Sequence, residues 1–147
     1  MRVSTRVEYG MLALADIVLH TEDGSSVSAP DIAERQHISH KYLEQILTHL
    51  KQAGLIRAQK GLRGGYTLSR PAETIRLSEV LDALDNSILE EMSQAGDSDN
   101  SLRAAVNACL WGKLNRLMTE FVENKTLAEF AQECRNQTCD EWDMYTI

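Results

Sequence analysis

The sequence predicts a mainly α-helical protein that contains one small β-hairpin. Apolar residues recur at helical spacing along the chain, and only two of the 147 residues are proline. One Gly-rich stretch between two short alternating segments is the exception, and it indicates the hairpin. Hydrophobic residues make up 43% and charged residues 25%, which argues against disorder. A chain of this length can bury a core without disulfides or metals.

The first third of the chain predicts three helices. The first covers about residues 5–20. Ser28, followed by an early proline and an acidic residue, caps the second helix, which is expected to stop near His37. Ser39 caps the third helix, and Gly54 ends it. Because about three residues join the second and third helices, the spacing is that of a helix-turn-helix.

The hairpin is expected directly after this helix pair. Strands over residues 55–59 and 66–69 flank the basic loop Lys60-Gly61-Leu62-Arg63-Gly64-Gly65. A short helix at residues 78–84 follows. A helix pair followed by a basic Gly-rich hairpin is a winged helix-turn-helix, which we assign to residues 1–85.

The remainder of the chain predicts a connector and two helices. Residues 86–100 form a polar connector, residues 101–125 a long helix of roughly 37 Å, and the Thr126–Glu129 capping box starts a short helix that ends near Arg135. We expect residues 136–147 to be a flexible tail. A helix longer than its own domain needs a partner surface, so residues 101–135 are expected to form a homodimer with a second copy. The candidate dimer contacts are Leu110, Leu114, Leu117, Met118 and Phe121.

The charge of the chain is divided unevenly. The net charge is −7, which at face value disfavours nucleic acid. Residues 1–76, however, hold ten Lys or Arg against eight Asp or Glu, and residues 77–147 hold five against fourteen. Within residues 39–70, six basic side chains face one acidic side chain. Local charge at the docked face decides contact with DNA, so the winged half remains a candidate.

The third helix is expected to enter the major groove of double-stranded DNA. Gln45 has the groups to pair with adenine, and Glu44 can accept a hydrogen bond from cytosine. The basic side chains of the hairpin tip reach the backbone or the minor groove, and its glycines allow close approach to phosphates. A winged helix used only for protein contact is the alternative, but the basic tip and polar helix face would serve no such partner. The candidate DNA contacts are Ser39, His40, Lys41, Tyr42, Glu44, Gln45, Thr48, Lys60, Arg63, Gly64 and Gly65.

The same residues carry a family resemblance. Residues 1–10 (MRVSTRVEYG), residues 38–47 (ISHKYLEQIL) and the run GLRGGYTL at 61–68 resemble the Rrf2 family of bacterial transcription regulators, the group that contains IscR, NsrR and CymR. Trp111 and the TLAE motif at 126–129 match as well, so the resemblance covers about residues 1–130. It implies a homodimer on a pseudo-palindromic promoter site and adds Arg2 to the DNA contacts. His37 departs from the family, which usually has glycine there, at a cost of roughly 1 kcal/mol if its backbone is left-handed.

The three cysteines bear on what such a regulator would sense. Cluster-bearing family members have three cysteines just before the long helix, and residues 85–107 here contain none. Cys109 follows the apolar spacing of the long helix and is expected to pack, and Cys134 and Cys139 lack a common zinc spacing. No metal site and no cluster of the usual kind are therefore expected.

Three sensing alternatives stay open. An atypical iron–sulfur cluster would join all three cysteines to Glu8 of the other subunit, as an acidic residue of the first helix does in some relatives. Cys134 and Cys139 would otherwise form a thiol switch, or the cysteines are unreactive. We expect a repressor that responds to a redox, iron–sulfur or metabolite signal.

Other functions fit less well. The sequence lacks Gly-x-x-x-x-Gly-Lys-Ser/Thr, His-Glu-x-x-His and Gly-x-Ser-x-Gly motifs, and its Gly-rich loop opens into a strand and not a helix, so an enzyme is not expected. Control by a partner enzyme that docks on the acidic C-terminal half remains an alternative. No apolar run approaches a membrane span, and the first residues lack an apolar signal core, so we expect a cytoplasmic protein.

Overall fold

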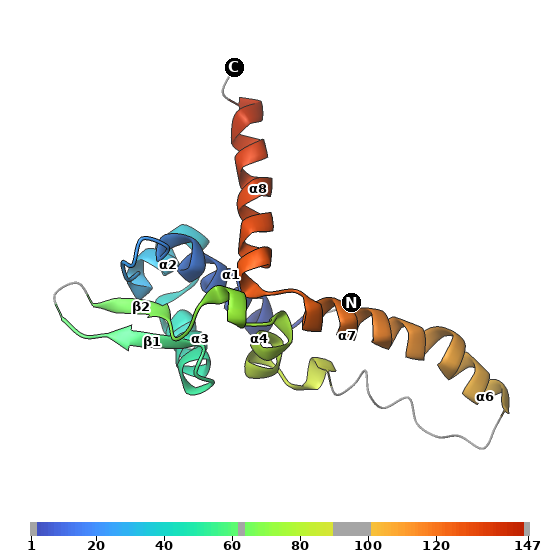
Figure 1. Cartoon of the computed structure of the whole chain (residues 1–147). Helices are drawn as coiled ribbons and strands as arrows, with labels where there is room; N and C mark the ends of the chain where they lie inside the picture. The colour runs from blue at the N-terminus through green and yellow to red at the C-terminus, as the bar shows by residue number, and fades with distance from the viewer. Residues whose placement is uncertain (1–2, 62–63, 90–100, 146–147) are drawn as a thin grey trace.

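The computed structural model describes residues 3–61, 64–89 and 101–145, and it describes side chains as far as residue 139. The predicted mainly helical fold with one small hairpin is confirmed. The elements α1 to α4, with β1, β2 and η1, form a compact unit that we call the head, and two helical arms leave it in different directions, one made of α6 and α7 and one made of α8 (Figure 1). The elements are α1 (Thr5–His20), α2 (Ala29–Gln36), α3 (His40–Gln52), β1 (Ile56–Gln59), β2 (Gly65–Leu68), a 3₁₀ turn η1 (Ala72–Thr74), α4 (Leu77–Leu84), α6 (Ser101–Val106), a π-helical turn η2 (Asn107–Trp111), α7 (Gly112–Asn124) and α8 (Leu127–Tyr145).

Serine caps start the first three helices. In each case the serine hydroxyl oxygen accepts a hydrogen bond from the backbone amide three residues on, at 3.2–3.3 Å, which satisfies one of the free N–H groups of the first turn. The capping residues are Ser4, Ser28 and Ser39. At the other end of α2, His37 has φ 53° and ψ 46°, so the helix-turn-helix turn is left-handed at a residue with a side chain.

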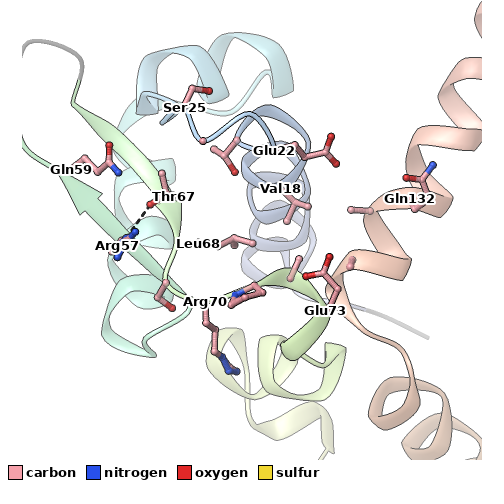
Figure 2. Close-up of a pocket in the computed structure, with 17 residues that line it drawn as sticks. Val18, Glu22, Ser25, Arg57, Gln59, Thr67, Leu68, Arg70, Glu73 and Gln132 are labelled. Carbon is pink, nitrogen blue, oxygen red and sulfur yellow. Dashed lines mark hydrogen bonds between the residues drawn. The ribbon is translucent and has the colours of Figure 1, made fainter.

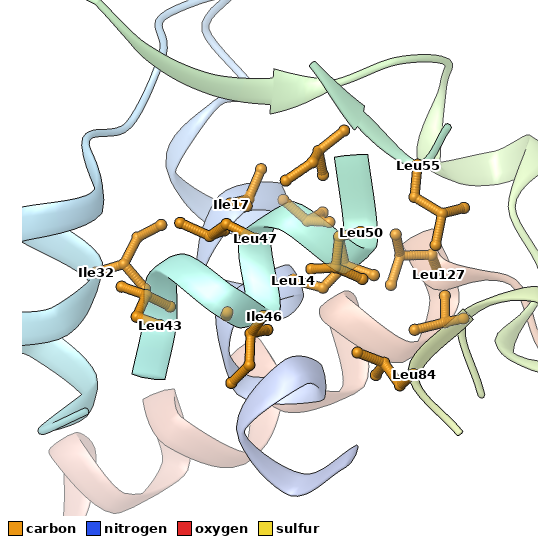
Figure 3. Packing of buried hydrophobic residues seen from close by; sticks show 14 of the residues in the cluster. Leu14, Ile17, Ile32, Leu43, Ile46, Leu47, Leu50, Leu55, Leu84 and Leu127 are labelled. Carbon is orange, nitrogen blue, oxygen red and sulfur yellow. The ribbon is translucent and has the colours of Figure 1, made fainter. Parts of the chain in front are cut away.

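The core of the head lies where α1 crosses α3. Leu14 and Ile17 of α1 pack with the fully buried leucine and isoleucine side chains of α3 (Figure 3). The approach of α4 to α1 depends on Gly10, because a Cβ there would lie 2.4 Å from Leu84 Cδ2. These contacts fix α3, the helix with the exposed polar face, on a rigid support.

The wing is held to the head by a contact that the sequence did not predict. Strands β1 and β2 pair antiparallel, with Ile56 opposite Leu68. Val27, in the chain before α2, pairs with Tyr66 of β2 as a single antiparallel bridge, which we call the Val27–Tyr66 rung. The Val27 amide donates to the Tyr66 carbonyl at 3.1 Å, and the Tyr66 amide donates to the Val27 carbonyl at 2.7 Å. The start of β2, close to the tip of the hairpin, is therefore tied to the loop between α1 and α2.

The last helix also belongs to the head. Its capping box forms as predicted, with the Thr126 hydroxyl accepting from the Glu129 amide at 3.1 Å and the Glu129 carboxylate accepting from the Thr126 amide at 3.3 Å. Leu127 and Ala131 are buried in the core formed by α1 and α3. The link before α8 pairs with the segment before α4, since the Leu127 amide donates to the Ile75 carbonyl at 2.7 Å. The core is thus not confined to residues 1–85.

Two predicted boundaries in the C-terminal part differ from the structure. Helix α8 was expected to end near Arg135, with a loose tail after it, but it continues to Tyr145. Polar composition misled here, because residues 136–145 contain no Gly or Pro to stop a helix. The predicted helix over 101–125 is interrupted by a π-helical turn at Asn107–Trp111. Most of the predicted connector, residues 90–100, lies outside the described residues, and none of the described helices is long and apolar enough to cross a membrane.

Candidate nucleic-acid interface

Helix α3 has one buried face and one exposed polar face. Leu43, Ile46, Leu47 and Leu50 are fully buried. The exposed face carries six of the predicted DNA contacts, namely Ser39, His40, Lys41, Glu44, Gln45 and Thr48. This exposure is what a recognition helix requires, and contact of each residue with DNA stays a prediction.

Two of these side chains already make local hydrogen bonds. The Ser39 hydroxyl accepts from the Tyr42 amide as the N-cap of α3. The Thr48 hydroxyl donates to the Glu44 carbonyl at 2.8 Å. The Thr48 proton is therefore already donated within the helix, which leaves the hydroxyl oxygen and the methyl group for DNA. Glu44 and Gln45 keep their side chains free for base edges in the part of the chain that the structure describes.

Tyr42 is half-buried, unlike its exposed neighbours on the helix. Its ring meets the ring of Tyr9 from α1 edge to face, with centroids 5.8 Å apart and an interplanar angle of 77°. Sequence reasoning missed Tyr9, because only the fold brings the two tyrosines together. The signal that could have identified it is its place in the N-terminal motif, beside Gly10.

The wing tip is basic, and its glycines have a structural reason. Lys60 is exposed just after β1, and the Gly64 amide closes the tip by donating to the Gly61 carbonyl at 2.9 Å. A Cβ on Gly64 would lie 2.8 Å from the Gln59 carbonyl oxygen, and a Cβ on Gly65 would lie 2.6 Å from the Val27 carbonyl oxygen. Gly64 is thus needed to build the hairpin and Gly65 to let β2 approach Val27, whether or not they also approach a phosphate. The predicted contacts Arg2 and Arg63 lie outside the described residues.

A polar cavity of about 750 Å³ lies at the base of the wing, between β1, β2, η1, the end of α1 and α8 (Figure 2). Arg57 and Arg70 line it together with Glu22 and Glu73. The Arg57 Nε donates to the Thr67 hydroxyl at 3.3 Å across the strands. Because positive and negative side chains are balanced here, this side of the wing is a poor match for a phosphate backbone. The candidate DNA face is therefore α3 with the wing tip.

A second surface lies on the arm formed by α6, η2 and α7. Leu117 is 64% exposed and Phe121 59% exposed, and Leu110 and Leu114 are exposed beside them. Met118, also predicted as a dimer contact, is half-buried, and its role in a dimer stays a prediction. Leu117, Met118 and Phe121 also line an apolar groove of about 400 Å³, together with side chains of α1, of α4 and of the residues before α1, among them Val3, Val7, Met11, Leu77 and Leu81.

The cysteines do not meet in the folded chain. Cys109, which we expected to pack, is exposed in the π-helical turn, and Cys139 is exposed on α8. Burial, and then the nearby carboxylate of Glu133, raise the pKa of the half-buried Cys134 thiol, which disfavours the thiolate that binds metals. The arms that carry Cys109 and Cys134 diverge (Figure 1), and Glu8 lies exposed on α1. Among the described residues, no three His, Cys, Asp or Glu side chains come together as metal ligands. Within one chain, the described side chains therefore do not assemble a set of cluster ligands.

The sequence and the architecture are similar to those of known proteins. The Rrf2 family, described as an iron-dependent transcriptional regulator, matches residues 3–133. The chain is 36% identical over 133 residues to the HTH-type transcriptional regulator IscR of Cereibacter sphaeroides, covering 88% of this chain and 86% of that protein. It is 35% identical over 129 residues to IscR of Yersinia pseudotuberculosis, covering 88% of this chain and 78% of that protein.

Two solved structures superimpose well on the fold. IscR of T. potens aligns with a TM-score of 0.73 and 31% identity, over 91% of this chain and 88% of that chain. CymR, the global cysteine regulator of B. subtilis, aligns with a TM-score of 0.76 and 23% identity, over 90% of this chain and 98% of that chain. The likeness to CymR concerns the fold alone.

Proposed function

Since the chain belongs to the Rrf2 family and is therefore a DNA-binding transcription regulator, not an enzyme, we propose that it acts as a homodimer on a pseudo-palindromic operator. Each subunit would place α3 in a major groove and its wing tip on the adjacent backbone. A dimer that occupies promoter DNA excludes other proteins from it, so repression is the expected outcome. The observation that carries the proposal is the exposed apolar arm beside a rigidly supported polar helix.

The arm supports the dimer. Leu110, Leu114, Leu117 and Phe121 are spaced so that they share one side of the helical arm. Four exposed apolar side chains side by side are unfavourable in water, and such a patch marks an interaction surface. A second copy offers the same stripe, and a two-fold axis lets the two arms cover each other. The apolar groove between α1, α4 and α7 lies next to the stripe and would take side chains from the partner's arm.

The arm is also well placed to hold two DNA-binding faces at a fixed separation. Helix α7 packs on α4 and leads directly into α8, which buries Leu127 and Ala131 of its first turns in the core. A rigid link between the dimer contact and α3 lets both half-sites bind as one unit, so affinity rises without new contacts.

The family is described as iron-dependent, but the described residues of this chain bring together no set of iron ligands. We propose that DNA binding here does not depend on a cluster, since the connector region 85–107 has no cysteine, and Cys109 lies on a different arm from Cys134 and Cys139. Anaerobic purification with an iron assay tests this part. Iron bound in stoichiometric amount and required for operator affinity would contradict it.

A change at Leu117 tests the dimer. Leu117→Asp should give monomers by light scattering and a large loss of operator affinity, because two half-sites are no longer linked. Leu117→Met keeps the apolar surface and is the matched control, which should remain a dimer with unchanged affinity. The operator can be obtained by selection from a random duplex pool with the unmodified protein. A Leu117→Asp variant that stays dimeric would refute the role given to the arm.

A further inference from the structure

We propose that Tyr9 of α1 is a positioning residue for DNA binding, because its ring holds the Tyr42 hydroxyl in place to donate to a DNA phosphate. This inference rests on the proposed function. It assigns to α1 a direct part in shaping the DNA face. Tyr9 itself is not placed in contact with DNA.

The two rings are in defined contact. Their centroids lie 5.8 Å apart at an interplanar angle of 77°, which is the edge-to-face geometry that the ring quadrupoles favour. Both rings are half-buried and pack against the hydrophobic core. In the described part of the chain, neither tyrosine hydroxyl has a hydrogen-bond partner, so the Tyr42 hydroxyl is available to an external acceptor.

The backbones on both sides of this contact cannot shift easily. Gly10, next to Tyr9, lies against the buried side chain of Leu84 of α4, and a Cβ at this position would lie 2.4 Å from Leu84 Cδ2. Leu43, next to Tyr42, is fully buried. Because both helices are fixed, the ring of Tyr9 limits the positions that the ring of Tyr42 can occupy.

Position on the helix explains why this matters for DNA. Tyr42 lies in the first turn of α3, three residues after the Ser39 cap, among exposed residues that include His40 and Lys41. First-turn residues of a recognition helix lie nearest the bases and phosphates. A tyrosine hydroxyl that donates to phosphate positions the protein without reading sequence. A ring free to rotate would lose part of that bond to conformational entropy.

The experiment measures binding to a short labelled duplex of arbitrary sequence at low salt, where phosphate contacts dominate. Tyr42→Phe removes the hydroxyl and should weaken binding by about tenfold. Tyr9→Leu removes the aromatic ring and should weaken binding by about fivefold. Tyr9→Phe keeps the ring and is the matched control, which should bind as the unmodified protein does.

The double variant separates positioning from a general effect on folding. If Tyr9 acts through Tyr42, the pair Tyr9→Leu with Tyr42→Phe should bind no more weakly than Tyr42→Phe alone. A full additional loss in the double variant would overturn the inference, as would unchanged affinity of Tyr9→Leu or of Tyr42→Phe. Absence of any duplex binding by the unmodified protein would instead refute the proposed function.

Folding is checked by thermal unfolding of each variant, with Tyr9→Met as a second replacement. Should both replacements unfold, nuclear Overhauser contacts between the two rings in the unmodified protein provide the test. These contacts should persist in the DNA complex, and their loss on DNA binding would overturn the inference.

Discussion

Asp16 of α1 accepts two hydrogen bonds from the guanidinium of Arg35 in α2, from Nε at 2.9 Å and from an Nη at 2.8 Å. Gln36 donates a third hydrogen bond to the same carboxylate at 2.8 Å. Asp16 is only 2% exposed, whereas Arg35 is partly exposed, and the pair fastens the first helix of the helix-turn-helix to α1.

Arg35→Met should destabilise the fold, because it leaves a buried carboxylate without its main counter-charge. The expected loss is about 2–3 kcal/mol of unfolding free energy, less than for a fully buried pair since Arg35 is partly exposed. Chemical denaturation of the two proteins measures it. Lys51→Met, at an exposed lysine, is the control and should change stability little. An equal effect of both changes would show that the ion pair contributes nothing.

Stability should also depend on acid pH through Asp16. Burial raises the pKa of its carboxyl group, but hydrogen bonds from Arg35 and Gln36 and the nearby positive charges outweigh burial and hold the pKa below its ordinary value of 3.8. A group with a lowered folded-state pKa stabilises the fold above its ordinary pKa, and this contribution is lost as pH falls through the folded value. The stability difference between the unmodified protein and Asp16→Asn should therefore be largest near neutral pH and shrink below about pH 4. Denaturation curves across this range check it, and a constant difference would contradict it.

His37→Gly should stabilise the protein. Residue 37 has positive φ, a conformation that glycine adopts without the Cβ penalty, although glycine also gives the unfolded chain more freedom. The net gain should be about 0.5–1 kcal/mol. The His37 side chain is exposed, so no core contact is lost. His37→Ala keeps the Cβ and should not show the gain, and a stabilised alanine variant would point to a different cause.

Gly65→Ala should loosen the wing from the head. The added methyl group would lie 2.6 Å from the Val27 carbonyl oxygen, so the rung between Val27 and Tyr66 must open or shift. We expect a loss of about 1–3 kcal/mol, with faster hydrogen exchange at both amides of the rung. Unchanged exchange at Val27 and Tyr66 would show that the close approach is not required.

Lys60→Ala should weaken binding to all duplex sequences alike. If Lys60 neutralises one phosphate, the slope of log affinity against log salt should fall by about 0.9. A Lys60 variant with an unchanged slope would place that side chain away from the DNA backbone.

Gln45→Ala should instead weaken binding to the selected operator only, by about 1–3 kcal/mol, with binding to other duplexes unchanged.

Local features of the head were predictable because they depend on neighbouring residues. The Ser28 and Ser39 caps and the capping box at Thr126 each follow from a hydroxyl or carboxylate a few residues from a free amide. The two strands of the wing begin and end within a residue of the predicted positions, since the Gly-rich loop fixes where the hairpin turns.

Features formed by distant residues were not predictable. Asp16 and Arg35 are nineteen positions apart, and Val27 and Tyr66 are separated by two helices and a strand, so no spacing rule connects them. The exposure of Cys109 was missed for another reason. Apolar spacing looks the same whether a helix face packs on its own domain or waits for a partner.

The burial of Leu127 and Ala131 has a practical consequence for anyone who wishes to express the winged half by itself. A fragment that stops near residue 85 would lack these two side chains and leave a gap in its hydrophobic core. The segment around Ile75 would also lose its backbone hydrogen bonds to Lys125 and Leu127. During synthesis, the core of the head can be completed only after α6 and α7 have been translated, because Leu127 and Ala131 follow them in the sequence.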